Sequence, residues 1–309
     1  MKIIFLGTPD FSAGVLEALI NSRHEVVGVV TQPDKPSGRG HKLLPTPVKV
    51  LAEKHNIPVY QFKRISKECE VLKQLNADIM ITAAYGQILR QNVLDLTPKG
   101  VINVHASLLP KYRGSSPIQW CIVKGETETG VTIMKTDIGV DTGDMILARA
   151  IPIGEQETAG ELFDRLSILG REVLLEALDL IESGKETYTK QDESQMSHYP
   201  MLDKDSGFIS FENSAKDIVN LCRGFNPWPV AYVNLDDQNR LKVYKASALS
   251  GEFESYNNGD IISCDSKNGL VVKCNGGAVS LDIIQSAGTK AMPAKDYLRG
   301  RKLNVVIFK

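Results

Sequence analysis

The sequence is poor in cysteine, and its cysteines follow no metal-binding or redox pattern. The 309 residues include five of them, an odd number, at scattered positions: Cys69, Cys121, Cys222, Cys264 and Cys274. Neither a Cys-x-x-Cys pair nor a Cys/His spacing typical of zinc occurs. The pattern argues against a disulfide framework and predicts reduced thiols in a cytoplasmic protein.

Long hydrophobic runs are also missing. The N-terminal segment MKIIFLGTPDF has a short apolar run that stops at Gly7. This run is too short for the core of a signal peptide and far too short to cross a bilayer, so we expect no membrane association. The 42% hydrophobic content still suffices for a folded core, and the length suggests about two domains.

The sequence has no excess of either charge. It carries 36 Lys and Arg residues against 37 Asp and Glu residues, and the net charge is −1. This balance argues against a general nucleic-acid coat but leaves room for a local basic patch. A mild basic bias falls on residues 207–309.

Two common ligand motifs are absent. The first strand-to-helix turn, FLGTPDFSAG, lacks Gly-x-Gly-x-x-Gly and has Pro9 and Phe11 where a pyrophosphate needs bare backbone, which argues against a nicotinamide dinucleotide. The segment TDIGVDTGDM contains three aspartates, but a calcium-binding EF-hand would need Glu at Ala148. We therefore expect no metal.

Apolar runs alternate with helical patterns in the first 184 residues. Six runs have the character of buried strands: 2–6, 25–31, 77–85, 100–105, 130–136 and 145–153. Helix starts are indicated by Thr46-Pro47, by Ser116-Pro117 and by a capping box at Thr158–Glu161. This order predicts an α/β fold, with a Rossmann-like parallel sheet in an N-terminal domain over 1–184.

A change of composition marks a second domain. Residues 185–206 are polar and predict an extended linker. After one helical pattern at 214–224, five short strand patterns follow over 207–309, separated by turns such as NNGD and SKNG. They predict a small β-barrel or sandwich, of which we favour an OB-like β-barrel.

Two polar side chains end a predicted buried strand in VINVHASLLPKYRGSSP. Asn103 and His105 are two residues apart, so they project from one face of the strand near its carboxyl end, where α/β sheets bind ligands. Asp141 lies in a glycine-flanked loop after the next predicted parallel strand, so it is placed to reach His105. An amide that stabilises an oxyanion, an imidazole that moves a proton and a carboxylate that orients it suit acyl transfer. His105 alone would more simply be a structural histidine.

No covalent nucleophile accompanies these residues. Cys121 lies inside an apolar helical pattern, and Ser107 lacks a nucleophile elbow such as Gly-x-Ser-x-Gly. The chemistry left is direct acyl transfer to an external nucleophile.

A long loop follows the second predicted strand. In TQPDKPSGRGHKLLPTPVK, two glycines bracket Arg39, and Lys35, His41 and Lys42 lie nearby. A flexible, cationic segment is typical of a lid over a polyanionic substrate, although a solvated surface loop has the same composition.

The motif NVHASLLPKYRGSSPIQW, followed by DTGDM, resembles the signature of the 10-formyltetrahydrofolate-dependent formyltransferases. The resemblance implies that Asn103, His105 and Asp141 are the catalytic trio. Some members of the family formylate a purine precursor or an amino sugar, and others hydrolyse the formyl-folate. The segments GTPDFSAGVLEAL and RGFNPWPVAY, and the long basic loop, resemble the branch that formylates methionyl initiator tRNA.

The resemblance also implies binding residues. The donor 10-formyltetrahydrofolate would lie against Tyr85, Gly86, Gln87, Ile88 and Leu89 and against Ser107, Leu108, Leu109 and Pro110. The loop with Lys35, Arg39, His41 and Lys42 would contact the tRNA acceptor end, and the C-terminal barrel would contact the acceptor arm. We expect a monomer. The alternatives are a formyl-folate hydrolase, another formyl-folate-dependent amine formyltransferase, and a non-catalytic RNA-binding protein built on a decayed enzyme.

Overall fold

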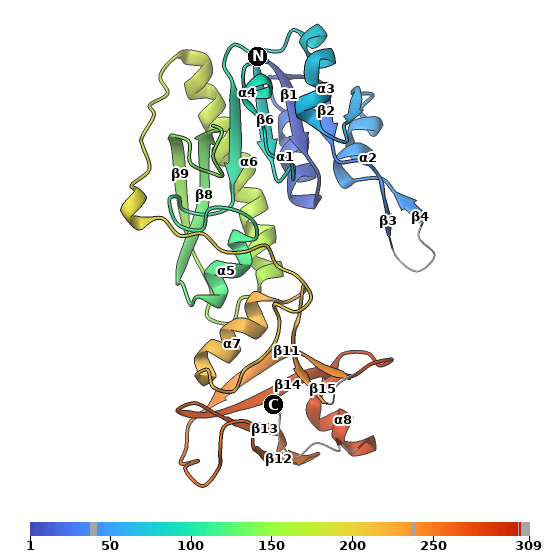
Figure 1. The fold of residues 1–309 in the computed structure, drawn as a ribbon, viewed down its shortest axis with the longest axis vertical. Coiled ribbons are helices and arrows are strands. Elements are labelled where there is room, and N and C mark those ends of the chain that lie inside the picture. The colour runs from blue at the N-terminus through green and yellow to red at the C-terminus, as the bar shows by residue number, and fades with distance from the viewer. Residues whose placement is uncertain (38–41, 236–238, 302, 304–309) are drawn as a thin grey trace. The chain divides into compact units, whose positions relative to one another are not determined.

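A computed structural model describes residues 1–37, 42–235, 239–301 and 303, and it divides the chain into two compact units. Unit 1 comprises Met1–Gly114, Thr129–Ile151 and Phe163–Tyr199. Unit 2 comprises Ser115–Glu128, Pro152–Leu162 and Pro200–Lys309. Figure 1 shows the elements of both.

A seven-stranded sheet forms the centre of unit 1, in the order β5-β2-β1-β6-β7-β8-β9. Its strands are β1 (Lys2–Gly7), β2 (Glu25–Thr31), β5 (Val59–Gln61), β6 (Ile79–Ala83), β7 (Val101–His105), β8 (Glu128–Lys135) and β9 (Met145–Pro152). The five strands from β5 to β7 pair in parallel. The Rossmann-like fold class predicted from the sequence is confirmed.

Helices cover both faces of this sheet. They are α1 (Asp10–Ile20), α2 (Pro47–Lys54), α3 (Ile65–Glu68), the 3-10 helix η1 (Cys69–Leu75), α4 (Gln91–Leu94) and α6 (Ala159–Ser183). On one face, Met80 of β6 belongs to a buried cluster with Ile65 and Leu72. On the other, Gly170 of α6 lies against Val104 of β7. Strand side chains alternate between these two cores, which is why the strands are apolar throughout.

One strand of the sheet, β8, runs against the expected parallel direction. β8 pairs antiparallel with β7, with His105 opposite Thr132. A strand buried on both faces has the same apolar composition in either direction, so its pattern could not distinguish the two. The connection 136–144 joins β8 to β9. It is too short for a parallel crossover, which needs about a dozen or more residues, so its length indicates that these two strands run in opposite directions.

The three predicted helix starts are confirmed, and two of them have a side-chain cap. The Thr46 side chain accepts a hydrogen bond from Lys49 N, at the start of α2. At Thr158, the hydroxyl oxygen accepts from Glu161 N while the Glu161 carboxylate accepts from Thr158 N, which is a complete capping box. A helix also begins at Pro117 as predicted, with Ser116 at its N-cap position, but Ser116 is left-handed, with φ of 65°, and its side chain makes no capping bond.

The capping box gives a testable stability difference. Thr158→Ala is expected to lower the free energy of unfolding at pH 7 by about 1 kcal/mol. Hydrogen bonds from the Thr158 backbone N–H, and then from its hydroxyl, hold the pKa of Glu161 below its usual value. This stabilisation is present above the unfolded pKa and is lost as pH falls through the folded one. Denaturant unfolding should therefore show a smaller difference below pH of about 4; an equal difference at both pH values would contradict the assignment.

The long loop after β2 contains a small hairpin. β3 (Lys35–Ser37) pairs antiparallel with β4 (Lys42–Leu44), and the sequence pattern did not predict either strand. At its base, Lys49 Nζ lies 2.7 Å from Asp34 Oδ2. Hydrogen bonds from Lys49 and then Gln61 hold the pKa of Asp34 below its usual value. Asp34, which precedes the hairpin, is thus held in place by Lys49 and Gln61.

The polar segment after α6 is hydrogen-bonded to unit 1 along much of its length. Thr189 forms a bridge with Met145, and His198 forms one with Arg113. Between them lies the 3-10 helix η2 (Glu193–Gln195), in which the Asp192 side chain accepts a hydrogen bond from Ser194 N. We call residues 189–199 the strap. The predicted linker is therefore extended, but this part of it is a structural element of unit 1.

Unit 2 is built on an antiparallel sheet in the order β10-β11-β14-β13-β12, with β15 paired to β14. Its strands are β10 (Ala231–Asn234), β11 (Arg240–Leu249), β12 (Ile261–Asp265), β13 (Gly269–Cys274), β14 (Gly277–Gln285) and β15 (Met292–Pro293). Its helices are α5 (Pro117–Val123), α7 (Ala215–Gly224) and α8 (Ala294–Gly300). The five predicted strands are present. Within the described ranges no β10–β12 pairing closes the sheet into a ring, so the pairings define an antiparallel sheet.

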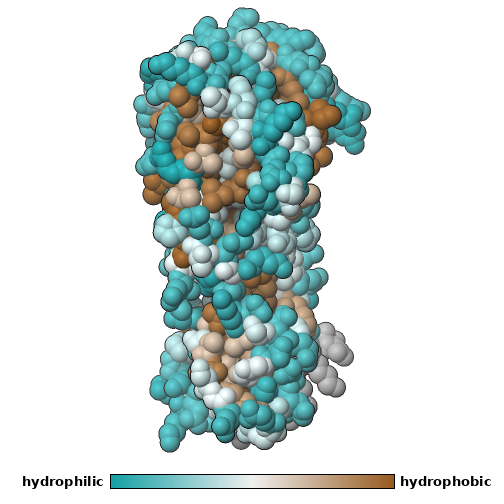
Figure 2. All heavy atoms as spheres, turned by 90° about the vertical axis from the view of Figure 1, so that its left-hand side faces the viewer, coloured by the Kyte–Doolittle hydropathy of each residue, from teal (hydrophilic) through white to brown (hydrophobic). Residues whose placement is uncertain are grey.

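The surface is mixed in character. Figure 2 shows a face on which hydrophilic residues predominate, with hydrophobic groups between them. Among the large hydrophobic side chains that are exposed, Ile88 and Ile138 both lie in loops of unit 1. Within the described residues, no helix has the length and apolar character needed to span a membrane.

Candidate active site

The loops that follow the parallel strands meet at one edge of the unit 1 sheet. Thr8, just after β1, donates its hydroxyl hydrogen to Tyr85 O, and the Gln32 amide, just after β2, donates to the same oxygen. Tyr85 itself follows β6, the neighbour of β7. This edge is where ligands bind in open α/β sheets.

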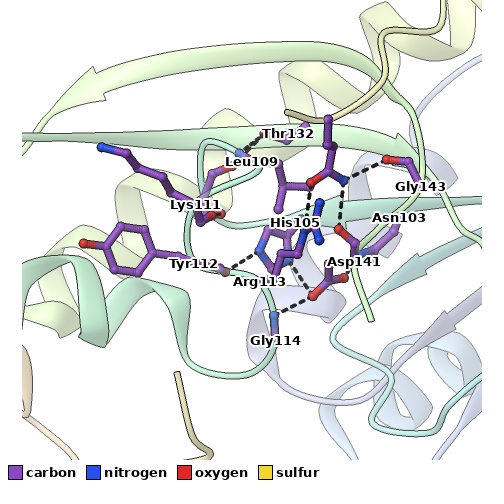
Figure 3. Close-up of polar contacts among 12 residues, drawn as sticks. Asn103, His105, Leu109, Lys111, Tyr112, Arg113, Gly114, Thr132, Asp141 and Gly143 are labelled. Atoms are coloured by element: carbon purple, nitrogen blue, oxygen red, sulfur yellow. Dashed lines mark hydrogen bonds and ion pairs between the residues drawn. The ribbon is translucent and has the colours of Figure 1, made fainter. Parts of the chain in front are cut away.

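Asn103, His105 and Asp141 converge beside this edge (Figure 3). Asn103 Nδ2 donates to Asp141 Oδ1 over 3.3 Å. His105 Nδ1 lies 3.6 Å from Asp141 Oδ2, with the His105 side chain 6% exposed and that of Asp141 16% exposed. The sequence-based expectation that these three side chains meet is thus matched by their positions.

Backbone groups of the loop after β7 fix the imidazole and the carboxylate. Tyr112 O lies 2.9 Å from His105 Nε2. A carbonyl can only accept, so this contact places a proton on Nε2 and leaves Nδ1 toward Asp141. Gly114 N donates to Asp141 Oδ2 over 2.8 Å. Gly114 has φ of 91°, and a Cβ there would lie 2.8 Å from the His198 ring, so glycine is needed.

Asp141 reaches the site by a different route from the one expected. Because β8 is antiparallel to β7, the connection 136–144 leaves the sheet at the amino end of β7, and Thr136 N donates to Val101 O. The connection then turns back, with Asp137 Oδ1 accepting from Gly139 N and from the Thr142 hydroxyl. The proximity is confirmed, but our reason for it, two parallel strands opening on one edge, was wrong.

The same connection adopts a costly backbone conformation. Asp141 has φ of 53°, in the left-handed region. This region costs a non-glycine residue about 1–2 kcal/mol. At Gly143, a Cβ would collide with Lys135 O, so a glycine is required there. Contacts around the connection must offset this cost.

The side chains that could serve as covalent nucleophiles are engaged elsewhere. Ser107 is fully buried and donates its hydroxyl hydrogen to Lys111 O. Cys121 is buried and donates to Ile118 O. Neither is among the groups around His105 Nδ1, so the geometry suits attack by an external nucleophile.

The loop over residues 85–89 presents backbone and one apolar side chain. Tyr85 and Leu89 are buried, whereas Ile88 is 72% exposed. The Gln87 side chain holds the loop, because it accepts from Ile65 N and donates to Phe62 O. Burial raises the pKa of the Tyr85 hydroxyl. In the described part of the chain, the backbone of 86–89 has no hydrogen-bond partner, so it can bind the edge of a planar heterocycle.

The segment 107–110 forms the other predicted wall. Thr132 donates to Ser107 O and accepts from Leu109 N, which ties the segment to β8. Because Ser107 and Leu109 are buried, Leu108 and Pro110 offer the more accessible surface. Ser107, which was expected to line the folate site with its three neighbours, is fully buried, and its hydroxyl bonds to Lys111 O.

Two of the predicted tRNA-contacting residues lie on the strands of the hairpin. Lys35 is exposed on β3, and Lys42 begins β4. Arg39 and His41 lie outside the described residues. On β4, Leu43 is 66% exposed and Leu44 is 52% exposed. The hairpin therefore presents apolar as well as cationic groups.

Several groups that shape the site were missed by the sequence interpretation. They are the backbone groups of Tyr112 and Gly114, and the buried side chains of Arg113 and Gln191. Backbone contacts have no residue-type signal. Gln191 and Arg113 differ from most long polar residues in being buried. Burial within a polar segment is not visible in a single sequence, so it could not be used to find them. No cluster of three or more metal-ligating side chains occurs among the residues that the structure describes.

Comparisons with known proteins cover both units. Residues 1–178 match the family model described as formyl transferase, and residues 201–302 match that of the formyl transferase C-terminal domain. The methionyl-tRNA formyltransferase of Geobacter metallireducens is 46% identical over 305 residues, which span 98% of this chain and 96% of the relative. That of Acetivibrio thermocellus is also 46% identical, over 98% of this chain and 97% of the relative.

Solved structures agree on the fold. The sugar 3N-formyl transferase WlaRD, in a structure with dTDP and 5-N-formyl-THF, has a TM-score of 0.68 and 20% identity, and covers 94% of this chain and 99% of its own. With both units matched by formyl transferase models and with relatives aligned over nearly their whole length, the chain belongs to the formyl transferase family, in its methionyl-tRNA formyltransferase branch.

Proposed function

We propose that Asn103, His105 and Asp141 transfer the formyl group of 10-formyltetrahydrofolate to the α-amino group of methionyl initiator tRNA. The convergence of these three side chains at the carboxyl edge of the sheet carries the proposal. In this reaction the amine nitrogen forms a bond to the formyl carbon, and the bond from that carbon to the folate nitrogen breaks.

Asn103 would stabilise the oxyanion that forms on the formyl group. Its amide has two N–H donors, and one of them already bonds to Asp141 at 3.3 Å. The other is directed away from the carboxylate, since the two N–H bonds of an amide diverge. A positioned donor of this kind is typically worth about 10²–10³ in kcat.

His105 would hand a proton to the leaving folate nitrogen. Its Nε2–H is held by Tyr112 O, so Nδ1 is the ring atom that can carry the mobile proton. Asp141, whose carboxylate lies 3.6 Å from Nδ1, would accept the proton released by the attacking amine, directly or through water. Because Gly114 N also donates to this carboxylate, the Asp141 side chain is held in one orientation.

The residues present suit a reduced folate. The backbone of 86–89, which has no hydrogen-bond partner among the described residues, would supply donors and acceptors for a pteridine edge, and Ile88, Leu108 and Pro110 would supply apolar surface. The donor contributes the activated formyl group, and the loops bind and orient it. We propose that the chain acts as a monomer in the cytoplasm.

One assay separates this function from its alternatives. The protein is incubated with 10-formyltetrahydrofolate that is labelled in the formyl group, with and without methionylated initiator tRNA. Label on the methionine is expected only when tRNA is present, and it should be lost in Asp141→Asn. Labelled formate without tRNA would indicate a hydrolase, and no label transfer with intact tRNA binding would indicate a non-catalytic RNA-binding protein.

The segment of the sequence that contains Arg39 should contribute to tRNA binding. Arg39→Ala is expected to raise KM for methionyl-tRNA by about tenfold, because an Arg–phosphate contact is worth roughly 1.5–3 kcal/mol before loss to solvent. KM for the folate should change little. The measurement is initial rate against each substrate in turn, with Lys99→Ala as a control on the same unit. A defect confined to the folate would contradict this role.

A further inference from the structure

The strap contacts the two segments that position Asp141 and His105. Through Gln191 it reaches the connection that carries Asp141, and through Ser197 it reaches the loop that holds His105. All of these residues belong to unit 1. The strap contributes no side chain within hydrogen-bonding distance of Asn103, His105 Nδ1 or the Asp141 carboxylate among the described residues. Its effect on the site must therefore be indirect.

Gln191 is the main link to Asp141. Its Nε2 donates to Asp141 O over 2.8 Å and to Gly143 O over 2.8 Å. Its Oε1 accepts from Arg113 Nε over 2.9 Å. Because guanidinium can only donate and carbonyls can only accept, this arrangement fixes the orientation of the amide, and both of its N–H donors are used.

The two bonds that Gln191 Nε2 donates stabilise a strained part of the backbone. Asp141 is held in the left-handed region, with φ of 53°, and its carbonyl oxygen is one of the two atoms that Gln191 binds. The other, Gly143 O, lies on the far side of Thr142. Gln191 therefore holds the turn from both sides, in the conformation that aims the Asp141 carboxylate at His105.

Arg113 fixes Gln191 in turn. The Arg113 side chain is 4% exposed, and its two terminal nitrogens bind the Glu193 carboxylate at 3.0 and 2.6 Å. This pairing holds the pKa of Glu193 below its usual value. Arg113 also lies between Tyr112 and Gly114, which supply the backbone groups that bind His105 and Asp141. The same buried side chain therefore joins the strap to the loop after β7.

Ser197 completes the link on the histidine side. Its hydroxyl oxygen accepts from Tyr112 N over 2.9 Å, and Ser197 O accepts from Arg113 N over 2.9 Å. The Tyr112 ring stacks on that of Tyr199, with the ring centroids 5.3 Å apart. Tyr112 has φ of 60°, so its carbonyl is also aimed by a left-handed turn.

We propose that Gln191 is a positioning residue for the formyl transfer, which acts by holding Asp141 in its left-handed turn. The inference rests on the proposed function of the trio. Residues that orient a catalytic ligand without touching substrate typically contribute about 10–100-fold. A misplacement of about 1 Å is worth about 10²-fold in rate.

The test is steady-state kinetics of Gln191→Leu and Gln191→Glu. The Leu variant removes all three hydrogen bonds. The Glu variant keeps the acceptor for Arg113 but places an oxygen opposite two carbonyls. Both are expected to lower kcat by about 10–100-fold while KM for methionyl-tRNA and for the folate changes by less than about threefold. If the Leu variant does not fold, the Glu variant alone decides, because its charge is paired with Arg113.

Glu193→Gln is the matched control. It weakens the ion pair on the outer side of Arg113, where the Glu193 side chain is 67% exposed, and leaves the contacts to Asp141 intact. Its kcat should fall by less than that of either Gln191 variant, because the hydrogen bonds from Gln191 to Asp141 O and Gly143 O remain. A loss as large as that of Gln191→Glu would overturn the inference, because the effect would then come from the strap as a whole.

A double-mutant cycle distinguishes this inference from the proposed function. If Gln191 acts through Asp141, adding Gln191→Leu to Asp141→Asn should cause no more than about a twofold further loss. A full additional loss, or a normal kcat in a folded single Gln191 variant, would overturn the positioning role while leaving the trio intact. Near-normal turnover in Asp141→Asn would instead refute the proposed function.

Discussion

Replacing His105 with glutamine is expected to lower kcat by about 10²–10⁴-fold, the usual contribution of a positioned general acid or base. Glutamine can still donate to Tyr112 O, which receives the Nε2 hydrogen bond in the native site. It cannot carry a proton on the atom that faces Asp141, so the loss isolates proton transfer from loop structure.

Single-turnover assays with saturating tRNA and folate are the direct measurement, because they exclude product release. Binding of methionyl-tRNA should persist in the variant. His55→Gln is the matched control, since His55 is exposed at the end of α2, and it should leave turnover unchanged. Turnover of His105→Gln within about threefold of wild type would show that His105 transfers no proton in the rate-limiting step.

Asn103→Asp is the second large effect, with an expected loss in kcat of at least about 10²–10³-fold. The substitution preserves the shape of the side chain but replaces both amide donors with a carboxylate. That carboxylate would lie where Asn103 Nδ2 is now 3.3 Å from Asp141 Oδ1, so two negative charges would be adjacent. A developing oxyanion at the same place would be repelled by both.

Asn103→Ala separates the two parts of this effect. It removes the donor without adding charge, so its kcat should lie between those of wild type and Asn103→Asp. Rates are measured at saturating concentrations of both substrates, and folding is checked by circular dichroism. Equal activity of Asn103→Asp and wild type would mean that no oxyanion forms near this residue. Equal losses in the two variants would show that charge is irrelevant and only the donor matters.

The fold was largely accessible from the sequence because its strands and helices have strong, distinct periods. The direction of β8 was not, because a strand buried on both faces is apolar whichever way it runs. The hairpin at 35–44 was missed because short strands within a loop bury too little surface to impose a pattern. The αL conformation of Ser116 shows how a residue of the right type can still fail to cap a helix.

The site also contains some residues that the sequence indicated and others that it did not. Asn103, His105 and Asp141 stood out because polar residues at strand ends and in glycine-flanked turns are conspicuous in sequence. The groups that hold them, the Tyr112 carbonyl and the Gly114 amide, belong to the backbone, whose contacts depend on the tertiary structure. Gln191 lies 50 positions from Asp141 in a polar segment, and only folding reveals the contact.

The antiparallel direction of β8 limits which sequence changes the segment 136–144 can tolerate. Asp141 lies in the connection 136–144, which starts beside the amino end of β7. This connection must extend toward Asn103 and His105 and then return before β9 begins at Met145. Inserting or deleting a single residue in 136–144 would shift the carboxylate by about 3 Å, the span of one residue. Variation in this segment is therefore expected as substitution at constant length.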